Sequence, residues 1–270
     1  RRVLQSIYKN SSMNIDKNDI LIILPLIALL LIGIIMVTSS SIYIADNNQS
    51  NPFYFAQMQS LFIAIGILAM IFFLILPSNF LYRTDWIFML ISIILLIALF
   101  LPDVGTSVNG STRWIRIGPL GIQPSEICKF SLILYISGYS VRRMSEINSL
   151  RSFIKPLILL FVISILIMFQ PDLGSTAIVC ALVVGILFYA GISYSQLGLL
   201  ILLISLLGYL AITESPMRLA RILAFTDPFA PEVVQEAGWQ LSNSLISIGQ
   251  GGWFGVGLGN SIQKSFFLPE

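Results

Sequence analysis

Long apolar runs, separated by short polar segments, dominate the pattern of the chain. A helix needs about 17 to 25 predominantly apolar residues to cross the hydrocarbon core of a bilayer. Seven stretches approach that length, and they lie at residues 20–41, 56–77, 86–101, 126–141, 153–169, 173–192 and 196–213. The pattern predicts an all-α polytopic membrane protein with seven transmembrane helices.

The composition supports this class. Of the 270 residues, 56% are hydrophobic and only 10% are charged, which is more apolar surface than a soluble domain of this size buries. The formal net charge of +2 argues against a nucleic-acid partner. Cys128 and Cys180 lie in apolar stretches and are interpreted as packing residues. The sequence has no His, so acid–base chemistry within it must fall to Asp and Glu.

The positions of Lys and Arg predict the orientation in the membrane, because cytoplasmic loops are enriched in these residues. Basic residues precede the first predicted helix and follow the second and the fourth: Arg1, Arg2, Lys9, Lys17, Arg83, Arg142, Arg143, Arg151 and Lys155. This alternation predicts a cytoplasmic N-terminal segment at residues 1–19, a transmembrane bundle at 20–213 and a large extracytoplasmic loop at 214–270.

The predicted loop at residues 214–270 contains a further helical pattern. Apolar residues recur there at steps of three and four positions, as in an amphipathic helix: Val233, Val234, Ala237, Leu241, Leu245 and Ile248. We expect a helix that lies at the membrane interface and ends at the glycine-rich stretch beginning with Gly249.

The stretch GSTRWIRIGPLGIQPSEICKF at residues 110–130 concentrates charge between two apolar runs. Its QPSE tetrapeptide predicts a loop followed by a helix start. Arg113, Arg116 and Lys129 are candidates for binding a phosphate or pyrophosphate, because Arg offers a planar fork of donors and Lys a point charge. Local roles remain open as well, since Glu126 suits the first turn of a helix and can pair with Lys129 at i, i+3.

Three further charged residues are candidates for a site on the predicted extracytoplasmic face. Asp172, in QPDLG, either caps the helix that follows or is a functional carboxylate, since a carboxylate at membrane depth is costly. Arg218 and Arg221 share one helical face and suit either lipid headgroups or substrate phosphates. The sequence shows no cluster of residues dedicated to a metal.

Five motifs, in order along the chain, resemble the SEDS family of bacterial cell-wall polymerases. They are GSTRWIRIGPLGIQPSEICKF, QPDLGSTA, FTDPF, GWQLSNSLISIGQGGWFGVGLGNSIQK and the closing LPE. The resemblance runs from the first apolar stretch to the last residue. The segment GLGNSIQK resembles the division branch of the family, FtsW, more closely than the elongation branch, RodA.

The resemblance implies a peptidoglycan glycosyltransferase that polymerises lipid II, the undecaprenyl-pyrophosphate-linked disaccharide pentapeptide. The reaction would take place on the outer face of the bacterial cytoplasmic membrane, during cell division or cell-shape maintenance. The implied partners are a class B penicillin-binding protein and other divisome or elongasome proteins, and a divalent cation, Mg or Mn, would suit the pyrophosphate. The implied substrate-binding residues are Arg113, Lys129, Asp172, Glu126, Arg116, Arg218 and Arg221.

The resemblance also implies that part of the family pattern lies outside this sequence. Members of the family have about ten transmembrane helices, and their catalytic base is an aspartate in a His-Thr-Asp element just after LPE, beyond Glu270. We therefore expect a C-terminally truncated chain with no catalytic base within it and no activity of its own.

Two other functions are compatible with a polytopic architecture. A lipid II flippase or other transporter would carry polar residues through the bilayer midplane, whereas the charges here lie toward the ends of the predicted helices. A non-catalytic scaffold subunit of the divisome would bind its partner without turning over lipid II.

Overall fold

The computed structural model describes residues 17–49, 51–102, 104–108, 111–118, 120–231, 234, 238–257 and 260–261. The chain divides into two compact units, one formed by Leu74–Ser215 and the other by Arg1–Phe73 with Pro216–Glu270. The first unit contains most of the candidate residues from the sequence.

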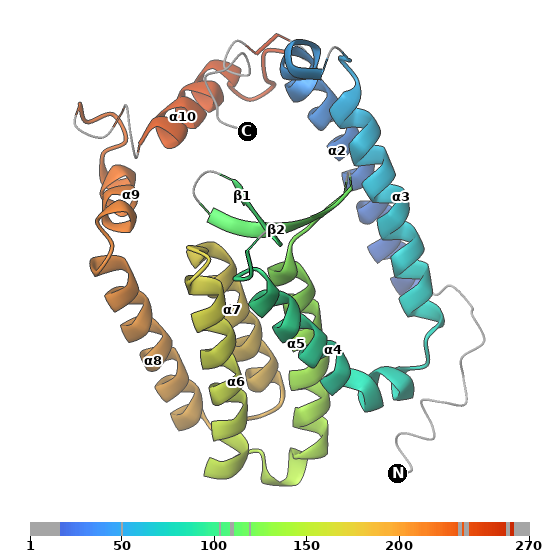
Figure 1. Cartoon of the computed structure of the whole chain (residues 1–270), viewed down its shortest axis with the longest axis vertical. Helices are drawn as coiled ribbons and strands as arrows, with labels where there is room; N and C mark the ends of the chain where they lie inside the picture. The colour runs from blue at the N-terminus through green and yellow to red at the C-terminus, as the bar shows by residue number, and fades with distance from the viewer. Residues whose placement is uncertain are drawn as a thin grey trace. The chain divides into compact units, whose positions relative to one another are not determined.

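The unit Leu74–Ser215 is a helical bundle with a small sheet (Figure 1). Its elements are α4 (Ser78–Ala98), α5 (Pro124–Arg142), the short 3-10 helix η1 (Met144–Glu146), α6 (Leu150–Met168), α7 (Leu173–Tyr189) and α8 (Tyr194–Thr213). Helix α7 packs against α5, α6 and α8, while α4 packs mainly against α5. The turn between α6 and α7 is therefore fixed by helices on several sides.

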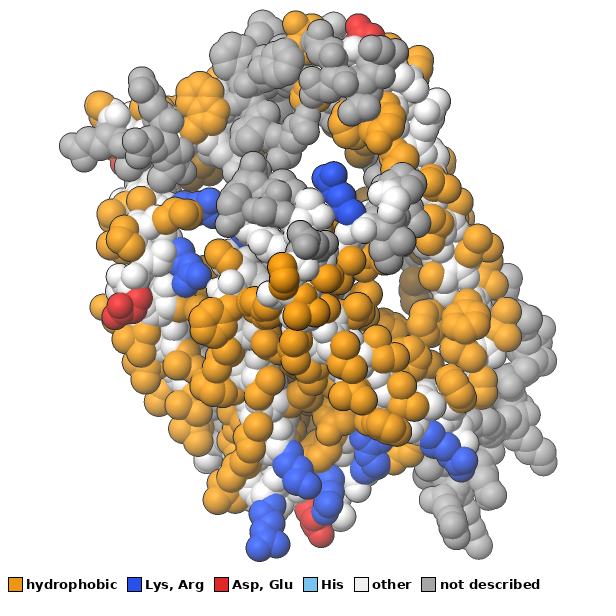
Figure 2. Space-filling view, viewed as in Figure 1, with side chains coloured by type: hydrophobic (Ala, Val, Ile, Leu, Met, Phe, Trp, Pro, Cys, Tyr) orange, Lys and Arg blue, Asp and Glu red, His pale blue; other side chains and the backbone are white. Residues whose placement is uncertain are grey.

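The core of the bundle is formed by the inward faces of α5, α6 and α7. Buried residues recur along these helices at steps of three and four, the spacing of a helix with one buried face: Cys128, Leu132, Ile136, Leu160, Ile163, Ile167, Val179, Val183 and Leu187. The outward faces are also apolar, and hydrophobic side chains cover the flanks of the bundle (Figure 2). Helices that are apolar on both faces are typical of a membrane-embedded bundle.

Short polar motifs fix the points at which the bundle helices begin. Ser149 and Ser193 cap α6 and α8, and each accepts a hydrogen bond from the backbone N–H three residues further on. Pro124 occupies the first turn of α5, directly after the N-cap residue Gln123. The helix start that the QPSE tetrapeptide predicted is confirmed.

A three-stranded antiparallel sheet occupies the region in which the sequence predicted only a loop. Its strands, β1 (Gly105–Val108), β2 (Ser111–Ile117) and β3 (Leu120–Ile122), pair in the order β1-β2-β3. Gly118 follows β2 with a φ of 62°, a left-handed conformation that glycine adopts readily and that suits a tight hairpin connection. The sheet lies at the end of the bundle where α5 begins (Figure 1).

The described part of the second unit contains two long apolar helices and two shorter ones. The long helices, α2 (Lys17–Gln49) and α3 (Tyr54–Ile75), expose apolar side chains along their length. The shorter ones are α9 (Pro216–Thr226) and α10 (Trp239–Gly251). Helix α10 covers the later part of the predicted amphipathic helix, and Gly252, with a φ of 53°, follows its last residue. Val233 and Ala237 of that pattern lie outside the described residues, and the interfacial position of the helix stays a prediction.

Each of the seven predicted apolar stretches falls on a helix. Within the described residues, five helices are long and apolar enough to cross a membrane, namely residues 19–46 of α2 and the helices α3, α4, α6 and α8. Helix α7 is apolar but shorter, and α5 has several serines on the face that it buries. The predicted class, an all-α polytopic membrane protein, is confirmed.

Basic side chains gather at the end of the bundle away from the sheet (Figure 2). Helix α4 begins, α5 ends and α6 begins at this end, and the exposed basic residues in these segments are Arg83, Arg142, Arg143, Arg151 and Lys155. The enrichment of cytoplasmic loops in Lys and Arg makes this the predicted cytoplasmic end of the bundle.

Candidate functional site

The candidate residues of the bundle meet at its sheet end. Strand β2 contributes Arg113, the first turns of α5 contribute Glu126 and Lys129, and the α6–α7 turn contributes Asp172. Strand β2 packs against α5, and Arg113 bonds to the α6–α7 turn. With Arg116, which is also on β2, five of the seven predicted substrate-binding residues lie at this end of one compact unit.

The guanidinium of Arg113 is held by the α6–α7 turn. Its Nε donates to the backbone carbonyl of Gln170 over 3.2 Å, and Nη2 donates to the carbonyl of Pro171. The same Nε lies 3.9 Å from Oδ2 of Asp172, and 32% of the Arg113 side chain is exposed. Arg113 is therefore a partly exposed cation that already has three oxygen neighbours.

Asp172 is the N-cap residue of α7. Its Oδ1 accepts a hydrogen bond from the backbone N–H of Ser175 over 3.0 Å, and its Oδ2 accepts one from the Ser175 hydroxyl over 2.7 Å. Thr176 Oγ1 also donates to the Asp172 carbonyl over 2.8 Å. The capping role that the sequence left open is therefore present. An ionised carboxylate has about four lone-pair sites, so the cap leaves acceptor capacity for a ligand.

Glu126 and Lys129 form an ion pair at the start of α5. Lys129 Nζ lies 2.6 Å from Glu126 Oε1, and the exposed fractions of the two side chains are 15% and 58% respectively. The i, i+3 pairing that the sequence left open is therefore present. A lysine ammonium has three donor hydrogens, so this pair leaves Lys129 able to bind a further anion.

The remaining three predicted residues are not brought into this cluster. Arg116 is exposed on β2, and it is paired across the ladder with Gly121 on β3. Arg218 and Arg221 lie on α9, which belongs to the other compact unit. Their role in substrate binding stays a prediction.

Gln170 was not among the candidate residues predicted from the sequence. Its side chain is almost fully buried, with 3% relative exposure, and its Nε2 donates to the carbonyl of Leu96 near the end of α4 over 3.4 Å. A buried amide needs such a partner. The contact joins residues far apart in the sequence, so no local pattern reveals it.

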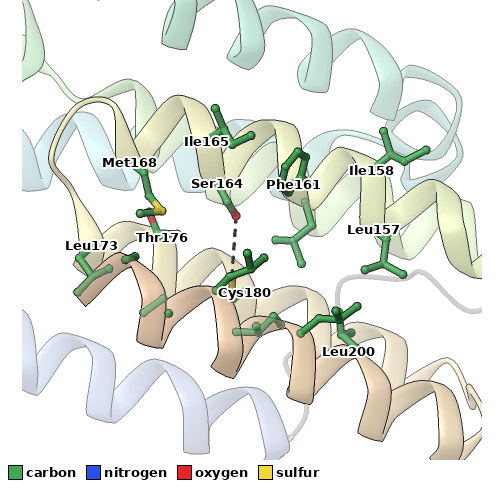
Figure 3. A pocket seen from close by; sticks show the side chains of 17 residues that line it. Leu157, Ile158, Phe161, Ser164, Ile165, Met168, Leu173, Thr176, Cys180 and Leu200 are labelled. Carbon is green, nitrogen blue, oxygen red and sulfur yellow. Dashed lines mark hydrogen bonds between the residues drawn. The ribbon is translucent and has the colours of Figure 1, made fainter. Parts of the chain in front are cut away.

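An apolar cavity runs along α6, α7 and α8 from the same turn (Figure 3). Its volume is about 590 Å³, and Met168, Leu173 and Thr176 line it next to the α6–α7 turn. Ser164 and Cys180 face one another inside it at 3.9 Å. None of the described residues that line the cavity is charged, so it suits a hydrocarbon chain better than a polar ligand.

The described part of the chain contains no group of three His, Cys, Asp or Glu side chains placed to hold a metal ion. At the sheet end, the carboxylate of Glu126 is paired with Lys129 and that of Asp172 with Ser175. These residues do not form a site that would hold a divalent cation by themselves.

The chain matches a known protein family over most of its length. Residues 19–270 match the cell cycle protein family of FtsW, RodA and SpoVE. The chain belongs to this family. The match includes every charged residue that the sequence analysis assigned to substrate binding.

Curated members of the family resemble the chain over most of its length. A probable peptidoglycan glycosyltransferase FtsW of Legionella pneumophila is 41% identical over 244 residues, which cover 90% of this chain and 61% of the relative. Another, of Alkalilimnicola ehrlichii, is 38% identical over 256 residues, which cover 94% of this chain and 63% of the relative. The chain thus spans less than two thirds of the length of these FtsW proteins.

Two solved structures have a similar fold. A chain from a peptidoglycan synthase complex described as coordinating polymerization and crosslinking has a TM-score of 0.61 and 26% identity, covering 84% of this chain and 65% of that one. The Thermus thermophilus rod shape determining protein RodA has a TM-score of 0.51 and 20% identity, and the match covers 89% of this chain and 90% of the RodA chain. At that identity the RodA likeness concerns the fold alone.

Proposed function

We propose that the full-length protein is a peptidoglycan glycosyltransferase that polymerises lipid II on the outer face of the bacterial cytoplasmic membrane. The observation that carries the proposal is the position of the charged cluster. Arg113, Lys129 and Asp172 gather at the end of the bundle where an uncharged cavity begins. A substrate with an anionic head and a long hydrocarbon tail fits both features.

The residues at the sheet end suit the anionic part of this substrate. Lys129 binds the pyrophosphate as a point charge with the hydrogens that Glu126 leaves free. A cation near the leaving pyrophosphate stabilises the negative charge that develops as its bond to the sugar breaks. The polyprenyl chain lies in the apolar cavity between α6, α7 and α8, where it is removed from water.

The reaction transfers the sugar with inversion at its anomeric carbon. The acceptor hydroxyl forms the new glycosidic bond on the face opposite the pyrophosphate, and the pyrophosphate leaves with the electron pair of the broken bond. A carboxylate accepts the proton of the attacking hydroxyl, as in inverting glycosyl transfer. The SEDS resemblance implies an aspartate beyond Glu270 for this step, and the role of Asp172 is to bind and orient the substrate.

The named relatives support this assignment. Those from Legionella and Alkalilimnicola are probable peptidoglycan glycosyltransferases, and the similar complex coordinates polymerization and crosslinking. We therefore propose a class B penicillin-binding protein as the partner, within the divisome or elongasome. A divalent cation, Mg or Mn, remains an expectation from the reaction class, and we assign no step to it because the described residues do not form a site for one.

Glycan-strand formation from lipid II tests the proposal. The full-length protein, purified in detergent with its penicillin-binding partner, should produce strands, and Lys129→Met should lower the rate roughly 100-fold through the lost stabilisation of the leaving group. Lys155→Met, at the other end of the bundle, is the matched control and should polymerise normally.

Two results would contradict the assignment of a glycosyltransferase activity. Absence of strands from a folded protein that still binds its partner would favour the scaffold function. Movement of lipid II across the bilayer of proteoliposomes without strand formation would favour the flippase.

A further inference from the structure

Strand β2 contains a bulge at Arg113. Thr112 pairs with Ser107 of β1, and Trp114 pairs with the neighbouring Thr106. Arg113, which lies between Thr112 and Trp114, therefore has no pairing partner on β1. The extra residue of a bulge leaves the ladder, and bulges often redirect a side chain next to a functional site. Here the redirected side chain reaches the α6–α7 turn.

The two carbonyls that Arg113 bonds belong to the turn between α6 and α7. Helix α6 ends at Met168, and Phe169 separates it from Gln170 and Pro171. The last carbonyls of a helix lack intrahelical partners and carry partial negative charge, so the C-terminal end of α6 also favours a nearby cation. The planar guanidinium can bond two carbonyls at once, which a lysine ammonium cannot do with the same geometry.

Gln170 holds the same turn from the inside of the bundle. Its buried side-chain amide donates to the Leu96 carbonyl of α4, while its own backbone carbonyl accepts from Arg113. The residue thus links α4 to the sheet through the turn. Asp172 stands two positions further on, and Ser175 fixes the orientation of its carboxylate.

We propose that Arg113 and Gln170 are positioning residues, which hold the α6–α7 turn so that the carboxylate of Asp172 meets the substrate. This inference rests on the proposed polymerase function for its kinetic consequences. It assigns Arg113 a contact with protein carbonyls in place of the phosphate contact expected from the sequence, and it gives Gln170 a role. Small displacements of a positioned group lower turnover strongly, roughly 100-fold for 1 Å.

Hydrogen exchange tests the positioning without reference to activity. In the full-length protein with its partner, Arg113→Gln and Gln170→Leu should each speed amide exchange across residues 170–176, because the turn and the first turn of α7 lose their restraints. Arg116→Gln removes a cation from the same strand without touching the turn and should leave this exchange unchanged. Unchanged exchange in Arg113→Gln would overturn the proposal.

Kinetics with lipid II distinguish positioning from direct phosphate binding. A positioning role predicts that Arg113→Gln lowers kcat at an unchanged KM, that Arg113→Lys does not restore it, and that Arg113→Gln adds nothing in an Asp172→Asn background. A raised KM, rescue by lysine, and a full additional loss on Asp172→Asn would show that Arg113 binds phosphate and would overturn the proposal. A wild-type protein without polymerase activity would refute the proposed function, while the exchange comparison would still decide the positioning role.

Discussion

The described part of the bundle contains two arginine–aspartate pairs, one near each end, and they differ in the distance between the charged groups and in what packs against them. At the basic end, Arg142 Nη1 of α5 lies 2.7 Å from Asp85 Oδ2 of α4, and only 2% of the Asp85 side chain is exposed. At the sheet end, Arg113 Nε lies 3.9 Å from Asp172 Oδ2. The first pair is a direct contact between helices, while the second is a loose approach between groups that have other partners.

The surroundings of Asp85 leave no room for a ligand. Arg142 also donates to the Tyr82 carbonyl over 3.2 Å and lies over the Tyr82 ring, 5.2 Å from its centroid. Gly138 packs directly against the pair, and a Cβ at that position would overlap Asp85 Oδ2. The Asp85–Arg142 pair therefore joins α4 to α5 and serves the fold.

Asp172 is also largely buried, with 10% of its side chain exposed, but its neighbours are different. Its carboxylate is oriented by Ser175 and lies at a turn beside a cavity and a partly exposed arginine. The comparison teaches that a charge at membrane depth indicates function only when its surroundings leave space for a ligand. Asp85 is enclosed by Arg142 and Gly138, whereas Asp172 lies at a turn beside a cavity and Lys129 retains donor hydrogens.

Removing the carboxylate of Asp85 should have the largest effect on stability. Asp85→Ala leaves Arg142 without its buried partner, and breaking such a pair costs about 3 to 5 kcal/mol, less some solvent screening of the partly exposed arginine. Thermal unfolding of the purified protein in detergent measures the loss. The control is Arg143→Ala, which removes a 2.9 Å pair with Glu146 whose side chains are both about half exposed, and which should cost less than about 1 kcal/mol. Equal losses would show that burial does not distinguish the two pairs.

Gly138→Ala should be the next most damaging change. The added methyl group overlaps the Asp85 carboxylate, and overpacking of this kind costs about 1 to 3 kcal/mol. Gly185→Ala, on α7, adds the same methyl where no atom lies within 4 Å and should stabilise the helix by up to about 1 kcal/mol. Unfolding midpoints of the two variants should move in opposite directions, and a parallel shift would contradict the tight packing at Gly138.

Substitutions of Asp172 separate its cap from its charge. Asp172→Ala removes the N-cap of α7 and should cost about 1 kcal/mol, whereas Asp172→Asn keeps a capping side chain and should be nearly neutral. If the carboxylate binds substrate, both variants should lose lipid II polymerisation to a similar degree. An active Asp172→Asn variant would reduce Asp172 to a structural cap.

The ion pair at the start of α5 should contribute least to stability. Because 58% of the Glu126 side chain is exposed, Glu126→Gln should change the free energy of unfolding by no more than about 0.5 kcal/mol. A much larger loss, measured by the same unfolding assay, would place this pair with Asp85–Arg142 as part of the fold and weaken its assignment to the substrate site.

The sequence predicted those features that depend on local pattern. The helices follow from runs of apolar residues and the start of α5 from QPSE. The cap was one of two roles offered for Asp172 by its position before a helix, and the ion pair was one role offered by the spacing of Glu126 to Lys129. Each of these interactions spans at most one helical turn, so neighbouring residues were sufficient to identify it.

The features that the sequence did not reveal depend on contacts between distant segments. The sheet was missed because its strands are short and the bulge at Arg113 breaks their alternation. Asp85 follows Arg83 near the start of α4 and resembles a surface residue until α5 buries it. Gln170 was missed because its partner is the Leu96 carbonyl, 74 positions earlier.

The hydrogen bond between Arg113 and Gln170 also constrains when this end of the bundle can form during synthesis. The two residues are 57 positions apart, and at a synthesis rate of about 5 to 20 residues per second the α6–α7 turn leaves the ribosome several seconds after β2. The contacts of Arg113 at the charged end of the bundle therefore form only after the α6–α7 turn has been synthesised.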